Sequence, residues 1–283
     1  MTKLTFLEAA NGERLGKTFK ETSTSSYPLV KTLNSFEYTP STIQERYDLI
    51  CEHAAKGHAL LRGDLTKLLA KESRRGLADK TKPNLTFFLD VDNLKLEGYT
   101  PPTGKLRSNH VENICERVIE LLPPWMHNVS YIGHASSSMG RAQSTYVSVH
   151  LEFVLTQAIN PAVLKEYTRF LNFDSEGISN QLTLSNTNTS VKTVLDPCVA
   201  DNPHLIYIAP PVFDGVDDPF QSPEHRFCLV EKADDTLNLT GHVTAIDSAT
   251  MFAKQRKRLD QLRKANSLPL YRPTKKDYVT KEG

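Results

Sequence analysis

Two aspartates, Asp90 and Asp92, lie one residue apart at the end of the apolar run Phe87-Phe88-Leu89. In a strand, side chains at alternate positions share a face, so both carboxylates are expected on the same side of the sheet. Their Cα atoms would then be about 6.5–7 Å apart, close enough for their oxygens to converge on a hard divalent cation. Because unpaired charges are costly to bury, two acids on a core strand favour a cation site. The alternatives for such a pair are a solvated loop, a helix cap or a turn.

The segment from Thr145 to Leu155 predicts a second strand with one apolar and one polar face. The polar face carries Tyr146, Ser148, His150 and Glu152. A hydroxyl and an imidazole donate hydrogen bonds to phosphate oxygens, so Ser148 and His150 are candidate phosphate ligands. A solvated face of an antiparallel sheet is the alternative. Upstream, Ser138 and Arg141 belong to a small-residue turn that either joins this site or forms a flexible hairpin loop.

A third strand is expected from Val191 to Pro197, because proline has no amide proton and ends a ladder of hydrogen bonds. Lys192 and Asp196 share one face of this strand. Asp196, at its end, is a candidate third metal ligand, although an isolated Asp-Pro pair is also typical of a turn. Lys192 is a candidate for neutralising phosphate charge or for pairing with the acids.

In this order, Asp90-Val91-Asp92, Ser148-Val149-His150 and Leu195-Asp196 resemble the motifs of the archaeo-eukaryotic primase (primase-polymerase) superfamily. The flanking segments 59–76 and 205–211 look like those of its phage and plasmid helicase-primase-type members. The resemblance covers about residues 55 to 215. It implies an α/β (α+β) fold with an RRM-like sheet and a second α/β lobe.

The resemblance also implies a function. Asp90, Asp92 and Asp196 would be the catalytic acids that hold Mg²⁺ or Mn²⁺, and Ser148 and His150 would contact the triphosphate. The expected activity is template-dependent nucleotidyl transfer by two metals, which makes or extends primers for phage or plasmid DNA replication. The expected partners are a single-stranded DNA template, nucleoside triphosphates and a possible helicase domain.

Three arginines near the first motif are candidates for template or phosphate contacts, or else solvated surface residues: Arg62, Arg74 and Arg75. Two other functions remain open. A metal-dependent nuclease would also use three acids, and a replication-initiator module would bind nucleic acid without catalysis. Nucleotide dependence separates them, because polymerisation needs added nucleoside triphosphates and hydrolysis does not.

Composition narrows the class of protein. The chain has 283 residues, 39% of them hydrophobic and 24% charged, as in ordinary soluble proteins. It contains no apolar run long enough for a membrane span and no secretory signal, so a cytoplasmic location is expected, in the host cell if the protein is phage-encoded. Four widely spaced cysteines favour reduced thiols. The net charge of +1 argues against tight non-specific duplex binding as the sole function.

The chain organisation is expected to be a catalytic domain over residues 1–250 and a basic helical tail or linker over 251–283. Residues 1–40 are expected to wrap the surface. Helices are predicted from Ser41 to Gly57, from Ser108 to Leu121, and from Asn160 to about Leu171.

Overall fold

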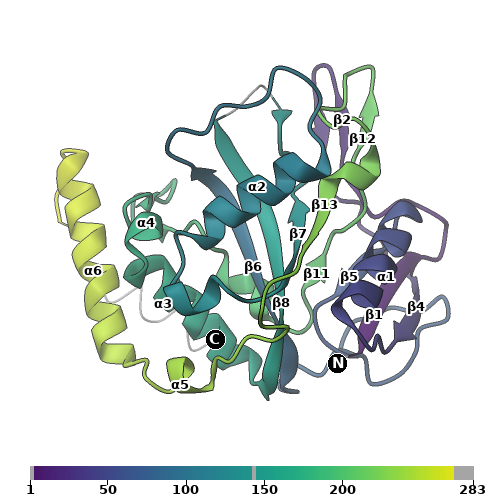
Figure 1. The fold of residues 1–283 in the computed structure, drawn as a ribbon, viewed down its shortest axis with the longest axis horizontal. Helices are drawn as coiled ribbons and strands as arrows, with labels where there is room; N and C mark the ends of the chain where they lie inside the picture. Colours follow the sequence, from purple (N-terminus) through teal and green to yellow (C-terminus); the bar gives the residue numbers. More distant parts are fainter. Residues whose placement is uncertain (1–2, 142–144, 271–283) are drawn as a thin grey trace.

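The computed structural model describes residues 3–141 and 145–270, which form a mixed α/β structure around two antiparallel sheets (Figure 1). The larger sheet occupies the middle of Figure 1, and the smaller lies beside it with the helix α1. The predicted α/β (α+β) class is confirmed at this level.

The larger sheet carries two of the three predicted motifs. Its strands in spatial order are β13 (Phe227–Val230), β7 (Tyr131–Ala135), β8 (Tyr146–Ile159) and β6 (Asn84–Lys95), all antiparallel to their neighbours. One face of this sheet packs against α2 (Ser108–Ile119) and α3 (Pro161–Asp174). Asn160 caps α3 by accepting a hydrogen bond from the backbone N–H of Ala162 (2.9 Å), which confirms the predicted start of this helix.

The segment around Asp196 runs along the outer edge of β6. The backbone N–H of Asp92 donates to the carbonyl of Val194, and that of Asp196 donates to the carbonyl of Asp90, both at 2.9 Å. Val91 and Leu195 form an antiparallel bridge between them. The predicted third strand is shorter than expected, because β10 (Val191–Lys192) pairs with β9 (Thr183–Leu184) and the chain then turns toward β6.

The smaller sheet contains the N-terminal residues, so the expectation that residues 1–40 wrap the surface is wrong. Its strands are β11 (Leu205–Ile206), β5 (Ala59–Leu61), β1 (Leu4–Ala9) and β4 (Leu33–Tyr38). Leu4, Phe6 and Leu7 are buried because β1 lies between β5 and β4. Helix α1 (Ile43–Ala55) lies beside this sheet.

The cap of α1 is one residue later than predicted. Thr42, rather than Ser41, is the N-cap, and its hydroxyl accepts a hydrogen bond from the N–H of Glu45 (3.1 Å). The carboxylate of Glu45 in turn accepts from the N–H of Ser41 (2.6 Å). Thr42 and Glu45 therefore form the cap of this helix, with Thr42 in the role expected of Ser41.

The remaining elements lie around the two sheets. They are the third sheet of β12 (Val212–Asp214), β2 (Thr18–Lys20) and β3 (Thr24–Ser25), the 3₁₀ turns η1 (Pro124–Met126), η3 (Pro197–Ala200) and η4 (Pro223–Arg226), and the helices α4 (Glu176–Ser179), α5 (Thr240–Val243) and α6 (Ser248–Ala265). Within residues 3–141 and 145–270, no helix has the length and apolar character needed to cross a membrane.

The basic tail begins as a packed helix. Leu259 of α6 joins the main hydrophobic core, and Lys254 pairs with Asp174 of α3 (2.6 Å). The domain boundary at residue 250 stays a prediction, although it falls just inside this helix. Residues 271–283 of the predicted tail lie outside the described residues.

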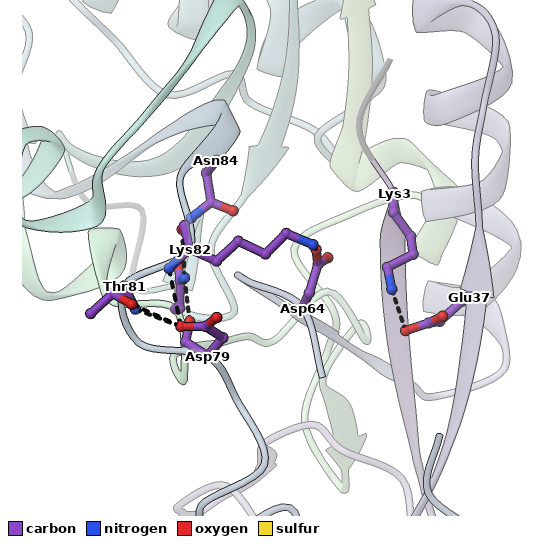
Figure 2. A network of polar contacts seen from close by, with 8 residues as sticks. Lys3, Glu37, Asp64, Asp79, Thr81, Lys82 and Asn84 are labelled. Atoms are coloured by element: carbon purple, nitrogen blue, oxygen red, sulfur yellow. Dashed lines mark hydrogen bonds and ion pairs between the residues drawn. The ribbon is translucent and has the colours of Figure 1, made fainter. Parts of the chain in front are cut away.

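The loop between β5 and β6, which carries Arg74, is fixed by polar contacts (Figure 2). The carboxylate of Asp79 accepts hydrogen bonds from the backbone N–H groups of Thr81 (3.0 Å) and Lys82 (3.2 Å). The side chain of Lys82 reaches Asp64 at 2.6 Å. These contacts hold the chain that leads into β6.

A buried ionic layer joins the two sheets. Arg46 of α1 donates from Nε to Oε1 of Glu152 on β8 (2.7 Å), and both side chains are almost fully buried. Arg62, just after β5, donates to the hydroxyl of Thr86 (2.7 Å) and lies over the ring of Phe88. Burial lowers the pKa of Arg62 to about 10, and the nearby positive charge of Arg46 adds to this, although Glu152 opposes it.

Gly133 on β7 leaves room for two thiols. A Cβ atom at this position would lie 2.6 Å from Sγ of Cys228 and 2.7 Å from Sγ of Cys115, both in the tightly packed core. Gly133→Ala is therefore expected to lower the free energy of unfolding by about 1–3 kcal/mol through overpacking.

Urea denaturation measures this effect, and Gly104→Ala is the matched control because no atom lies within 4 Å of its added Cβ. Adding Cys115→Ala and Cys228→Ala to Gly133→Ala is expected to reduce the effect of the added methyl group. Equal stability of Gly133→Ala and the wild type would contradict the packing described.

Candidate functional site

A row of side chains crosses the larger sheet on the face opposite α2 and α3. Asp90 on β6 stands opposite His150 on β8, which stands opposite His134 on β7, which stands opposite Phe227 on β13. Nε2 of His150 lies 3.0 Å from Oδ1 of Asp90, and Nδ1 of His150 lies 3.1 Å from Nδ1 of His134. The ring of His134 stacks on Phe227 with 4.6 Å between centroids.

The electrostatics of this row favour an ionised Asp90, a protonated His150 and a neutral His134. Burial alone lowers the pKa of His150, but the carboxylate of Asp90 outweighs burial and raises that pKa above its usual value. Burial raises the pKa of Asp90, but His150 outweighs this effect and holds the pKa below its usual value. Burial and the charge of His150 hold the pKa of His134 well below its usual range. A protonated His150 therefore donates to Asp90 and to a neutral His134.

Four of the predicted residues line one pocket with a volume of about 400 Å³: Asp90, His150 and Asp196 from the three motifs, and Arg74. The other lining residues include His204, Tyr27 and Tyr207. Asp196 is also the N-cap of η3, where its Oδ1 accepts a hydrogen bond from the N–H of Cys198 (2.8 Å). The motifs are far apart in the sequence, and they meet here because the segment that ends at Asp196 pairs with β6.

Asp92 does not line the pocket that contains Asp90. The register of β6 and β8 shifts between Val91 and Leu94, and Asn93 adopts a positive φ of 52°. The hydroxyl of Ser148 accepts a hydrogen bond from the N–H of Asn93 (3.0 Å) and so holds this bulge. Asp92 instead lines a separate pocket of about 760 Å³, so the simple alternation expected for the two aspartates breaks at the bulge.

The acids retain features of a site for a hard cation. Burial raises the pKa of Asp92, and the negative charges of Asp90 and Asp196 raise it further, so the three carboxylates repel one another. Oδ1 of Asp90 is buried and, apart from its ion pair with His150, receives no well-aligned hydrogen bond from any described residue. Carboxylate oxygens are the ligands that Mg²⁺ and Mn²⁺ prefer, so the chemistry of Asp90 and Asp196 fits such a cation. Among residues 3–141 and 145–270, no group of three or more acidic, histidine or cysteine side chains gathers at one point as a metal site.

The other predicted residues are dispersed. Lys192 lies with Asp92 in the larger pocket, and Arg141 lies over the ring of Phe19 and lines a third pocket. Ser138 and Arg75 are exposed and do not line the pocket of Asp90; the hydroxyl of Ser138 pairs with that of Ser136 (3.2 Å).

Among the three arginines, only Arg74 reaches the pocket of Asp90, where it donates to the carbonyl of Pro203 (2.6 Å). Arg62 is only 4% exposed and belongs to the buried layer between the sheets. It is therefore neither a solvated surface residue nor placed to touch a template.

Four residues of the site were not predicted: His134, His204, Tyr27 and Tyr207. His134 was missed because it belongs to none of the three motifs; the structure places it on β7, which continues to Ala135. Side chains two residues apart share a face, so His134 lies on the same face as Ile132, opposite His150 of the predicted polar face of β8. Tyr27 and Tyr207 stack with 3.6 Å between centroids, although they come from distant segments that no local pattern connects.

The low pKa of His134 makes stability depend on pH. The unfolded chain binds a proton at His134 below pH 6.5, whereas the folded protein does not, so stability is lost as the pH falls through this range. Between pH 7.5 and 5.5 the wild type is expected to lose about 1 kcal/mol more than His134→Asn, which keeps a neutral acceptor for His150. Urea denaturation of both proteins at the two pH values measures the difference. The same loss in both would show that His134 is protonated in the folded protein.

No protein-family model, curated protein or solved structure matches this chain.

Proposed function

We propose that this protein is a template-dependent nucleotidyltransferase of the primase-polymerase type, which makes or extends primers from nucleoside triphosphates with Mg²⁺ or Mn²⁺. The observation that carries the proposal is the meeting of Asp90, His150 and Asp196 in one pocket of about 400 Å³. Each residue comes from a different one of the three ordered motifs. An accidental resemblance of short motifs gives no reason for all three to converge.

The topology supports the same proposal. The chain runs through β6, α2, β7, β8 and α3 to the segment that bridges β6 at Leu195. When the segment at Leu195 is counted as a strand, the spatial order is this segment, β6, β8 and β7. Helices α2 and α3 both lie on one face of these strands. This order matches the β-α-β-β-α-β arrangement of RRM-like sheets and so supports the proposal, in which the smaller sheet with α1 would be the second lobe.

The charges of the pocket suit a triphosphate. The positive charge of a protonated His150 attracts phosphate, and the guanidinium of Arg74 can donate to phosphate oxygens; both residues line the pocket. Asp90 and Asp196 would hold the divalent cation, which would offset phosphate charge and favour ionisation of the attacking hydroxyl. The hydroxyl oxygen forms a bond to the α-phosphorus, the bond from that phosphorus to the β-phosphate oxygen breaks, and pyrophosphate leaves. The fixed positions of the pocket residues contribute orientation and electrostatic stabilisation.

The test incubates the protein with single-stranded DNA and Mn²⁺ or Mg²⁺, in one reaction with labelled nucleoside triphosphates and in a second reaction without any nucleotide. Labelled product that forms only with both nucleotides and template is the expected result. Metal-dependent shortening of the DNA without nucleotides would overturn the proposal in favour of a nuclease. Binding of DNA with neither reaction would instead indicate a replication-initiator module.

A further inference from the structure

The larger pocket, of about 760 Å³, lies on the other side of the β6 bulge from Asp90. It is lined by the bulge residues Asp92 and Asn93, by Lys95, by Tyr146 at the start of β8, by the loop 180–183 and by residues 192–194. The loop is held in place because Oε1 of Gln181 accepts a hydrogen bond from the N–H of Lys95 (2.7 Å). The pocket therefore has walls from several elements and touches the acidic cluster through Asp92.

The lining combines cations with an exposed aromatic ring. Lys95 and Lys192 are exposed, and neither forms an ion pair with another residue in the part of the chain that the structure describes. Tyr146 is 50% exposed, which is unusual for a large ring at the start of a core strand. Exposed rings beside unpaired cations are typical of surfaces that bind single-stranded nucleic acid, where bases stack and phosphates are neutralised.

The lining itself has no net positive charge, because Asp92 and Glu97 balance the two lysines. The adjacent helix α6 supplies the positive field: Arg258 donates to the carbonyl of Asn180 in the pocket loop (3.1 Å). From Met251 to Ala265 this helix has six cations, Lys254, Arg256, Lys257, Arg258, Arg263 and Lys264, against the single acid Asp260. A polyanion is therefore attracted toward this side of the molecule.

We propose that this pocket is the groove that holds the single nucleic-acid strand whose end reacts at Asp90. The inference rests on the proposed function, because nucleotidyl transfer joins two substrates and each needs its own compartment. The triphosphate fits the pocket of Asp90, His150 and Asp196. Asp92 is two residues from Asp90 yet faces the larger pocket, so the two compartments meet at the carboxylates. Lys95 and Lys192 contact phosphates, and a base stacks on Tyr146.

The test measures binding of a fluorescein-labelled single-stranded oligodeoxynucleotide by anisotropy, with EDTA present and no nucleotide. Tyr146→Ala is expected to weaken binding about tenfold through the loss of one stacked base. The double variant Lys95→Ala with Lys192→Ala is expected to weaken binding and to reduce the slope of log affinity against log salt by about 1.4. The matched control is Lys31→Ala with Lys80→Ala, which removes the same charge from exposed positions outside the groove.

These binding measurements test the groove independently of the proposed nucleotidyltransferase activity. The groove proposal would be overturned if the groove variants bound DNA with the same affinity and the same slope of log affinity against log salt as the control. This conclusion would hold even if the wild type synthesised DNA or RNA from nucleotides. A selective loss of binding would support the groove even if the synthesis assay failed. All substituted residues are exposed, and an unchanged urea midpoint for each variant verifies that it is folded.

Discussion

Replacing Asp90 by asparagine is expected to reduce nucleotide incorporation by at least about 10²–10³-fold, the usual effect of removing one electrostatic contact from an active site. Asparagine keeps the shape of the side chain but removes the charge that would hold a cation and that pairs with His150 at 3.0 Å. Initial rates of labelled nucleotide incorporation at saturating template measure the effect. Asp174→Asn is the control, because Asp174 is also ion-paired, to Lys254, but lies on α3 outside the pocket.

The same variant is expected to remain folded but to be slightly less stable at pH 7. The folded protein lowers the pKa of Asp90, so its charge contributes stability above pH 3.8 that is lost as the pH falls through the lowered value. His150 has a raised pKa because of Asp90, so its contribution is present below pH 6.5 and is lost as the pH rises through the raised value. An Asp90→Asn protein that retained the wild-type rate would show that the reaction, if any, takes place elsewhere.

The largest expected effect on stability comes from Glu152→Ala. Truncating this side chain removes the carboxylate that pairs with the buried guanidinium of Arg46, and Arg62 nearby loses its compensating charge. Breaking a buried ion pair from one side typically costs about 3–5 kcal/mol, and we expect a loss of this size in the free energy of unfolding. The reason is the cost of an uncompensated buried charge rather than the net strength of the pair.

Urea denaturation measures the effect, and two further variants control for it. Glu166→Ala removes a glutamate from an exposed pair with Arg169 and is expected to cost at most about 1 kcal/mol. The double variant Arg46→Met with Glu152→Met removes both charges and is expected to regain much of the stability. Similar small losses in Glu152→Ala and Glu166→Ala would contradict the burial of the ionic layer.

The sequence was sufficient for the strands and helices with strong periodicity. The runs around Leu89 and Leu151 alternate clearly, and the structure confirms both as core strands. The start of α3 at Pro161 followed from Asn160, whose side chain caps the helix as expected. These predictions succeeded because they depend on residues close together in the chain.

The errors have tertiary causes. Residues 1–40, which are mixed in composition, were expected to wrap the surface, but residues 4–9 are buried by pairing with two strands from later in the chain. The alternation of Asp90 and Asp92 failed because Ser148, from another strand, stabilises a bulge at Asn93. Arg62 can be buried between the two sheets because the negative charge of Glu152 lies nearby and the hydroxyl of Thr86 accepts a hydrogen bond from it. None of these partners can be identified from local sequence.

The most direct test of the central claim is a crystal structure of the protein with Mn²⁺ and a non-hydrolysable nucleoside triphosphate, using the anomalous signal of manganese. We expect manganese between the carboxylates of Asp90 and Asp196, with the phosphates beside His150 and Arg74 in the pocket of about 400 Å³. Manganese and nucleotide bound together elsewhere, with Asp90 still paired only to His150, would contradict the assignment of this pocket as the site of nucleotidyl transfer.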